Sequence, residues 1–240
     1  MAAVDCVQYI FNQITNNIFI ICITALSFVL LFAFLMISLI QSYISEPVQH
    51  PEGASAMFIL GSGGHTKELL TVAGDLNFAK YPIRTWVSFA GDSLSVVRAM
   101  ELEQKKTEDQ GTAYRASPKK AESVSTVQLP RARVVGQSYF TSIFTTLFCA
   151  LYCIYSVFKV RPDIVICNGP GSCVPICFAC ILLRSFRIKQ ARMFYIESLA
   201  RVNSLSLTGK ILYPIVDRFI VQWPQLAAKY ENAEYMGIVV

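Results

Sequence analysis

The residues best suited to chemistry begin with a short glycine-rich segment, Gly61-Ser62-Gly63-Gly64-His65. Glycines let a backbone turn sharply and approach a ligand closely, and the N–H groups of a following helix can hold a phosphate. The imidazole of His65 could bond that phosphate or act as a general base. Because the segment matches neither the P-loop nor the G-x-G-x-x-G pattern, a tight turn with a structural histidine remains an alternative.

A second segment, Asn168-Gly169-Pro170-Gly171, interrupts an apolar run that is typical of a buried strand. Its amides could bind an anion or a sugar hydroxyl. A plain turn between a strand and a helix explains the same pattern, so the residues alone favour the structural interpretation.

Glu197 and Arg201 belong to a third segment, at the end of another strand-like run. A carboxylate in this place can accept hydrogen bonds from a sugar or an amide. A guanidinium can pair with a phosphate through two parallel hydrogen bonds. The alternative is an ion pair between these two side chains on a surface turn.

Strand-like and helix-like segments alternate in the part of the chain that holds these residues. Strands are predicted at 57–60, 83–89, 163–167, 193–196 and 218–222, with a terminal apolar piece at 237–240. Helices are predicted from Thr66 onward and over 93–106, 138–158, 172–183 and 208–216. This alternation indicates a parallel sheet covered on both faces, where ligands bind beyond the carboxyl ends of the strands. The loops 61–65, 168–171 and 197–201 should therefore share one edge of the sheet.

An uncharged apolar run, Ile18–Ile40, precedes these elements. As a helix it would be about 34 Å long, enough for a hydrocarbon core of about 30 Å. It is too long for a signal peptide and has no basic start, which indicates a retained anchor. The predicted organisation is an N-terminal tail at 1–17, a transmembrane anchor at 18–40, a linker at 41–56 and one domain at 57–240.

The composition excludes a disordered chain and disfavours an ordinary cytosolic globule. Hydrophobic residues make up 54% of the chain and charged residues only 15%, against about 25% in typical soluble proteins. The net charge is +5, and all 21 Lys and Arg residues follow the apolar run. A basic domain behind an uncharged leader suggests an anionic membrane surface or ligand, and a cytosolic C-terminal domain.

The apolar segment 138–158 is also long enough to span a membrane, but it contains several Tyr, Thr and Ser residues. We expect a domain helix that is buried or touches the membrane, with a second span as the alternative. The polar stretch 107–126 has no function that we can assign. The apolar end 236–240 could be a docking strand for a partner or an edge strand of the chain's own sheet.

The eight cysteines lie mostly in apolar runs and do not resemble a disulfide framework. Buried free thiols in a reducing compartment fit this placement better. Cys173, Cys177 and Cys180 have a metal-like spacing, but no histidine lies near them in the sequence. We therefore predict no metal site.

Taken together, five ordered motifs resemble those of one family, the asparagine-linked glycosylation protein fourteen family. They are Phe58-Ile-Leu-Gly-Ser-Gly-Gly-His-Thr66, Asn168-Gly-Pro-Gly171, Tyr195-Ile-Glu-Ser-Leu-Ala-Arg201, Ser206-Leu-Thr-Gly-Lys-Ile-Leu-Tyr213 and Phe219-Ile-Val-Gln-Trp223. This family is the membrane-anchored subunit of the UDP-N-acetylglucosamine transferase of dolichol-linked oligosaccharide synthesis. The similarity covers roughly residues 57–240.

The resemblance implies a single Rossmann-like α/β domain, half of a GT-B glycosyltransferase, behind one transmembrane helix. It implies transfer of N-acetylglucosamine to dolichyl-pyrophosphate-N-acetylglucosamine on the cytosolic face of the endoplasmic reticulum. A soluble catalytic partner would hold most of the UDP-N-acetylglucosamine donor, and no cofactor would be tightly bound. The chain would recruit that partner, bind the acceptor and be inactive alone.

The resemblance also assigns roles to residues of the three loops. His65 is the candidate base or acceptor contact, and Glu197 the second candidate catalytic residue. The acceptor and its pyrophosphate are expected to contact Gly61, Ser62, Gly63, Gly64, Asn168, Gly169, Gly171 and Arg201. Two other functions remain open, a self-sufficient single-chain glycosyltransferase and a membrane scaffold without an acceptor site.

Overall fold

The computed structural model describes residues 53–109, 123–132 and 138–239, together with scattered positions between 17 and 33. The chain divides into two units, Met1–Ser45 and Glu46–Val240, and each is described by itself. In the first unit, the described positions are helical and exposed. The predicted anchor at 18–40 lies largely outside the described residues. Within the described residues, no helix combines the length and apolarity needed to cross a membrane.

The second unit contains one sheet of seven strands, all parallel, in the order β3-β2-β1-β4-β5-β6-β7. The strands are β1 (Ser55–Ile59), β2 (Ile83–Phe89), β3 (Ser123–Leu129), β4 (Ile164–Asn168), β5 (Arg192–Ile196), β6 (Arg218–Val221) and β7 (Ala233–Tyr235). The prediction of a single parallel α/β sheet is confirmed.

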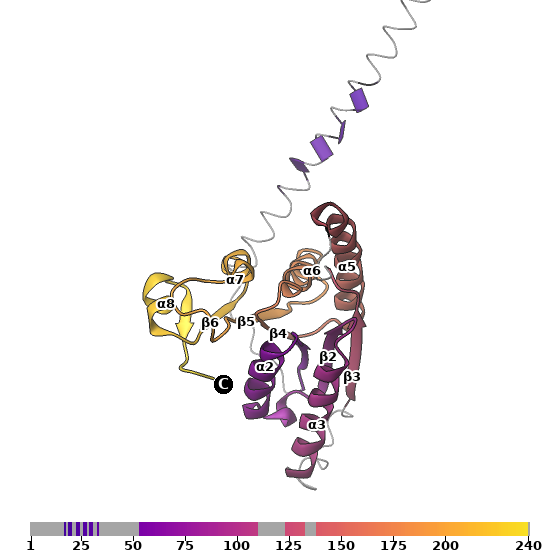
Figure 1. Cartoon of the computed structure of the whole chain (residues 1–240). Helices are drawn as coiled ribbons and strands as arrows, with labels where there is room; N and C mark the ends of the chain where they lie inside the picture. Colours follow the sequence, from indigo (N-terminus) through magenta and orange to yellow (C-terminus); the bar gives the residue numbers. More distant parts are fainter. Residues whose placement is uncertain are drawn as a thin grey trace, which may run out of the picture. The chain divides into compact units, whose positions relative to one another are not determined.

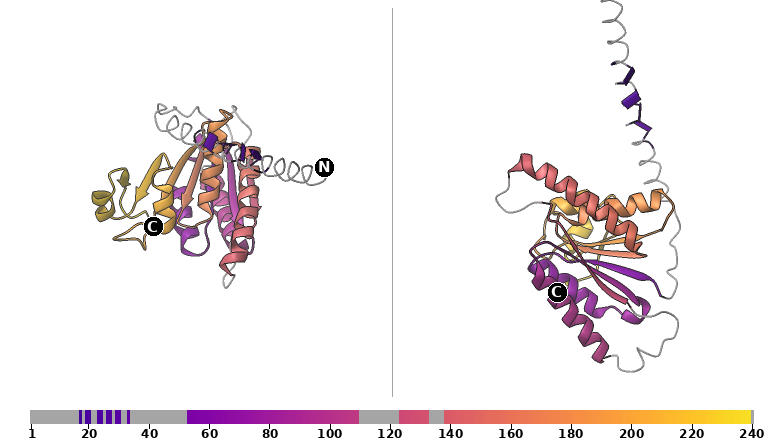
Figure 2. Two further views of the ribbon diagram at one scale, coloured as in Figure 1. Left: turned by 90° about the horizontal axis from the view of Figure 1, so that it is seen from above. Right: turned by 90° about the vertical axis from the view of Figure 1, so that its right-hand side faces the viewer.

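Helices cover both faces of this sheet (Figures 1 and 2). They are α2 (Gly64–Asp75), α3 (Ser93–Asp109), α5 (Tyr139–Val160), α6 (Cys173–Ser185), α7 (Leu207–Leu212) and α8 (Pro224–Lys229), with a short 3-10 helix, η1 (Phe78–Lys80). The pair α2 and α3 lies on one face, and α5, α6 and α7 lie on the other. The segment predicted at 138–158 is thus a domain helix that packs along α6.

The core is centred on β1 and β4, whose residues are all buried. Strands covered on both faces have continuous apolar runs, which is why both were recognisable in the sequence. On the α2 side, the ring of Phe58 stacks on Trp86 with the ring centroids 4.4 Å apart. Strand β1 begins at Ser55, slightly before the predicted boundary, because Asp163 accepts hydrogen bonds from the Ser55 amide and hydroxyl.

Several elements differ from the predictions, all of them away from the centre of the sheet. The edge strand β3 was not predicted, since most of its side chains are polar and exposed. Helix α8 was also missed. The edge strand near the C-terminus is β7, and residues 236–239 form no strand, so the edge-strand alternative for the apolar end is wrong. Val239 instead packs against the core, and docking of a partner at this end stays a prediction. Helix α7 ends well before 216 because Pro214 cannot continue a helix.

A buried ion pair ties α3 to the sheet. The Arg84 guanidinium, 1% exposed, donates from Nε and Nη2 to the Glu103 carboxylate, at distances down to 2.7 Å. The same carboxylate accepts a 2.8 Å hydrogen bond from the Trp86 indole. Removing one partner of such a pair leaves a buried charge without compensation, which costs much more than the net value of the pair.

Glu103→Ala should therefore lower the free energy of unfolding by about 3–5 kcal/mol. Glu101→Ala, at an exposed position of the same helix, should change it by about 0.5 kcal/mol or less. Urea unfolding of the full chain in detergent would measure both. The double variant Arg84→Met/Glu103→Leu should lose less stability than Glu103→Ala, because no charge is left buried. Equal losses in Glu103→Ala and Glu101→Ala would contradict this account.

Candidate functional site

The candidate site lies at the carboxyl edge of the sheet, where β1 and β4 run side by side. The chain leaves β1 toward β2 on one side and leaves β4 toward β5 on the other. The loops after β1 and β4 therefore separate, and crevices at such reversals are the usual ligand sites of open parallel sheets. The prediction that the loops 61–65, 168–171 and 197–201 share one edge is confirmed.

The loop after β1 needs glycine at its first position. A Cβ atom on Gly61 would lie 2.6 Å from Cβ of His65, which is too close, and 3.2 Å from Cγ of Pro170, which is a tight contact. Gly63 precedes α2 with a φ of 61°, a conformation that side chains rarely adopt. The Gly61 carbonyl accepts a hydrogen bond from the hydroxyl of Thr66. The glycines thus let two loops approach one another at the start of α2.

His65 is held by the loop after β4. Its Nδ1 lies 3.1 Å from Oδ1 of Asn168, while the Asn168 amide group donates a 2.8 Å hydrogen bond to Oε2 of Glu68. Because the Asn168 Oδ1 is an acceptor, the proton of the neutral imidazole belongs on Nδ1. That leaves Nε2 of His65 as the nitrogen that can take a proton.

The ring of His65 covers Gly169. A Cβ atom on Gly169 would lie 2.2 Å from both Nδ1 and Cε1 of the imidazole, and the φ of Gly169 is +66°. Glycine is therefore required at 169 for two independent reasons, the backbone conformation and the contact with the histidine ring. The second glycine segment shapes the position of the candidate base.

Glu68 joins α2 to the loops after β4 and β5 and was missed in the sequence. Besides Asn168, its buried carboxylate accepts hydrogen bonds from the Ser198 hydroxyl at 3.1 Å and from the Leu199 amide at 3.3 Å. The sequence could have indicated that Glu68 lies near the site, because Glu68 follows His65 by three positions and residues three apart on a helix share a face. The carboxylate was overlooked because acidic residues in helices usually face solvent.

Glu197 is fully buried and holds its own loop together. Its carboxylate accepts hydrogen bonds from the Ser198 amide at 3.0 Å and from the Ser206 amide and hydroxyl at 3.0 and 3.1 Å. A Cβ atom on Gly209 would lie 2.1 Å from Oε2 of Glu197, so glycine there makes room for the carboxylate. Arg201 is exposed, and the described residues provide no carboxylate partner for its guanidinium.

Two buried side chains near the site, those of Tyr195 and Cys167, have raised pKa values and stay uncharged. Burial and then the charge of Glu197 raise the pKa of Tyr195, whose hydroxyl lies 3.3 Å from that of Ser206. Hydrogen bonds with Cys173 and Cys177, together with burial, raise the pKa of Cys167.

The expectation of buried free thiols is confirmed for the six described cysteines. In the described part of the chain, no group of three or more His, Cys, Asp or Glu side chains is placed to hold a metal ion. Their placement agrees with a packing role for the thiols between α5, α6 and β4.

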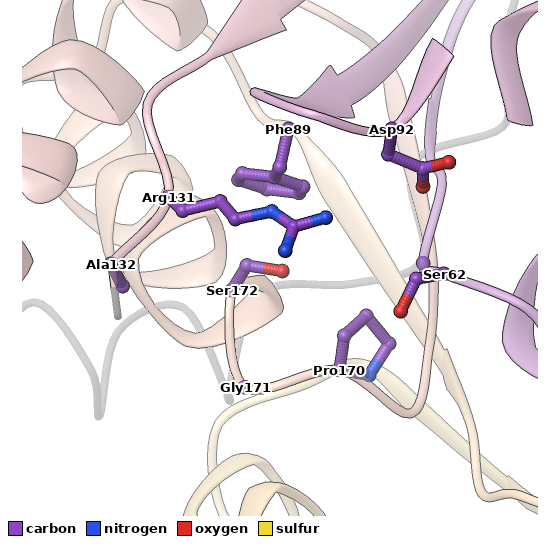
Figure 3. Close-up of a pocket in the computed structure, with 9 residues that line it drawn as sticks. Ser62, Phe89, Asp92, Arg131, Ala132, Pro170, Gly171 and Ser172 are labelled. Atoms are coloured by element: carbon purple, nitrogen blue, oxygen red, sulfur yellow. The ribbon is translucent and has the colours of Figure 1, made fainter. Parts of the chain in front are cut away.

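A pocket of about 300 Å³ opens beside these loops. It is lined by Gly61, Ser62, Phe89, Asp92, Arg131, Ala132, Pro170, Gly171 and Ser172. In Figure 3 the guanidinium of Arg131 points into the space between Phe89, Ser62 and Ser172. Asp92 on the opposite wall accepts hydrogen bonds from the Ser95 amide at 3.3 Å and hydroxyl at 2.8 Å, which caps α3.

The structure brings some of the predicted residues to this pocket and leaves others outside its lining. Gly61, Ser62 and Gly171 line it. The other predicted residues do not, namely Gly63, Gly64, His65, Asn168, Gly169, Glu197 and Arg201. Arg131 was missed because it follows β3, the one long strand that the sequence did not predict, so its place at this edge was not apparent.

Comparison with known proteins identifies the family. A family model described as "Oligosaccharide biosynthesis protein Alg14 like" matches residues 56–239. The "UDP-N-acetylglucosamine transferase subunit ALG14" of Yarrowia lipolytica is 43% identical over 184 residues, covering 77% of this chain and 80% of that protein. The proteins of the same name from Rattus norvegicus and Homo sapiens are 37% and 36% identical, each covering 82% of this chain and 88% of theirs.

Among solved structures, MurG of Acinetobacter baumannii superposes with a TM-score of 0.48 at 16% identity, covering 72% of this chain and 42% of that one. The family match, in contrast, spans nearly the whole α/β domain, and the identities to the relatives exceed 35% over most of both chains. The chain therefore belongs to the Alg14-like family of oligosaccharide biosynthesis proteins.

Proposed function

We propose that this chain is the membrane-anchoring, acceptor-binding subunit of a two-chain UDP-N-acetylglucosamine transferase. The complex adds the second N-acetylglucosamine to dolichyl-pyrophosphate-N-acetylglucosamine during synthesis of the N-glycan precursor. The chain recruits a soluble catalytic subunit to the cytosolic face of the endoplasmic reticulum membrane. That subunit holds most of the UDP-N-acetylglucosamine donor, and no tightly bound cofactor takes part. The subunit role is supported by the names of the relatives.

The observation that carries the acceptor role is the meeting of the glycine-rich loops with His65 at one edge of one domain. An inverting sugar transfer needs a general base that removes the proton of the acceptor hydroxyl as it attacks the anomeric carbon of the donor. His65 fits that role because Asn168 and Glu68 orient its ring and leave Nε2 available. The uridine diphosphate then leaves the donor with the bonding electron pair.

The exposed face of α5 supports a lipid-linked acceptor. Its exposed apolar and aromatic side chains are Phe144, Leu147, Phe148, Leu151, Tyr152 and Tyr155, each at least 47% exposed. Large apolar patches on a protein surface commonly mark contacts with membranes or partners. Two basic residues, Lys159 and Arg161, lie at the end of the same helix, where anionic headgroups would complement them. We assign this face to the lipid bilayer.

The apolar leader supports anchoring in the same membrane. Its described positions are helical, and their large apolar side chains are exposed, among them Phe19 at 64% and Leu30 at 61%. Burial of such side chains in hydrocarbon would stabilise membrane insertion. Glu197 has a supporting role in this proposal, because its carboxylate is occupied within its own loop.

The first test is transfer of radiolabelled N-acetylglucosamine to a dolichyl-pyrophosphate-N-acetylglucosamine analogue. We expect the detergent-purified full chain to be inactive alone and active once a soluble cytosolic fraction is added. Transfer by the pure chain would show a self-sufficient glycosyltransferase instead. No transfer in either condition would contradict the acceptor role and leave a scaffold.

The second test concerns the base. In the assembled complex, His65→Ala should lower kcat by about 10²–10⁴-fold, the usual contribution of general base catalysis. Glu68→Gln should lower kcat less and shift its pH profile, because the oriented hydrogen bond to Asn168 is disturbed. Glu108→Gln, at an exposed position of α3, is the control. Unchanged turnover in His65→Ala would remove this residue from the role of base.

The third test concerns α5. Leu147→Glu/Leu151→Glu should raise the KM for a long-chain acceptor in vesicles by about tenfold or more, since each buried leucine is worth roughly 1.5–3 kcal/mol. The KM for a water-soluble short-chain acceptor should stay nearly unchanged. Leu94→Glu/Val97→Glu on α3, where the side chains are similarly exposed, is the matched control. An equal rise for both acceptors would contradict a membrane contact at α5.

A further inference from the structure

The backbone on both sides of Arg131 is fixed. On one side, the Leu129 carbonyl accepts a 2.8 Å hydrogen bond from the Ala90 amide, which joins the loops after β3 and β2. On the other side, the Ala132 carbonyl accepts a 2.7 Å hydrogen bond from the hydroxyl of Thr145 in α5. These two hydrogen bonds hold the backbone next to Arg131 at the pocket wall.

The guanidinium of Arg131 is available to a ligand. It is half-buried and lies against Gly91, where an added Cβ atom would lie 3.8 Å from the guanidinium carbon. Among the described residues, no carboxylate forms an ion pair with it. Asp92, the acid in the pocket wall, is engaged by Ser95 at the start of α3, where the helix dipole offsets its charge. The Arg131 guanidinium is thus a cation of the pocket lining that has no ion-pair partner among the described carboxylates.

The other groups around the pocket favour an anion with several oxygens. The hydroxyls of Ser62 and Ser172 lie on its walls, and Ser172 is the N-cap residue of α6. The volume of about 300 Å³ is at the small end of ligand sites and leaves room for more than one phosphate group. A guanidinium fork suits two oxygens of such a group.

We propose that Arg131 holds the diphosphate of the lipid-linked acceptor in this pocket, which rests on the function proposed above. Arg131 takes the role that the sequence suggested for Arg201, which does not line the pocket. The same diphosphate chemistry occurs in the nucleotide-sugar donor. The acceptor is favoured because Gly61 and Ser62 of the pocket lead directly into the helix that carries His65, the candidate base for the acceptor hydroxyl.

The test compares Arg131→Ala and Arg131→Lys with the control Arg98→Ala, at an exposed position of α3. In the assembled complex, Arg131→Ala should raise the KM for the acceptor by about 10- to 100-fold, the value of charge-assisted hydrogen bonds, with kcat less affected. Arg131→Lys should be intermediate, because it keeps the charge and loses the fork. The KM for UDP-N-acetylglucosamine should not change.

A second measurement does not depend on transfer activity. Millimolar inorganic pyrophosphate should raise the thermal stability of the full wild-type chain in detergent, and Arg131→Ala should lose that shift. If no transfer is found but this difference persists, the function fails and the diphosphate site stands. A pyrophosphate shift retained in Arg131→Ala would overturn the assignment. So would a rise in the donor KM only, or a rise in acceptor KM in Arg201→Ala and not in Arg131→Ala.

Discussion

The site depends on the close approach of two backbones, the loop after β1 and the loop after β4. Gly61 and Gly169 make this approach possible, since a side chain at either position would overlap the His65 side chain. The histidine ring is enclosed between these loops and can bond Asn168 only because both positions lack a Cβ atom. Steric exclusion at two glycines therefore determines which nitrogen of His65 is left for a ligand.

The hydrogen bonds to Glu68 extend this constraint to the third loop. A buried carboxylate is costly unless its oxygens are hydrogen-bonded, and Glu68 meets that requirement by accepting from Asn168, Ser198 and the Leu199 amide. The loops after β4 and β5 are thereby held in position relative to α2. Glu197 does the same within the loop after β5. Glu68 and Glu197 therefore hold the loops at this edge in position, and the guanidinium of Arg131 lies in the pocket.

Much of the fold could be predicted because the central strands are covered on both faces and appear as apolar runs. Strand β3 could not, since its outward residues are exposed at the edge and its sequence resembles a polar loop. Because β3 was not predicted, the position of Arg131 at the carboxyl edge of the sheet could not be predicted either. Glu68 and Glu197 show a different limit, because a sequence does not reveal whether a carboxylate is buried or which amides satisfy it.

The pocket and the apolar face of α5 are parts of one arrangement. The Thr145 hydroxyl bonds the carbonyl of Ala132, so the pocket wall rests on the helix whose exposed side chains include Phe144 and Phe148. In a lipid-linked sugar the hydrocarbon chain is attached directly to the diphosphate. A site for the diphosphate therefore needs an apolar surface beside it along which the hydrocarbon chain can lie. The diphosphate site proposed here, beside an apolar helix, would meet both demands, whereas a soluble nucleotide sugar would need only the first.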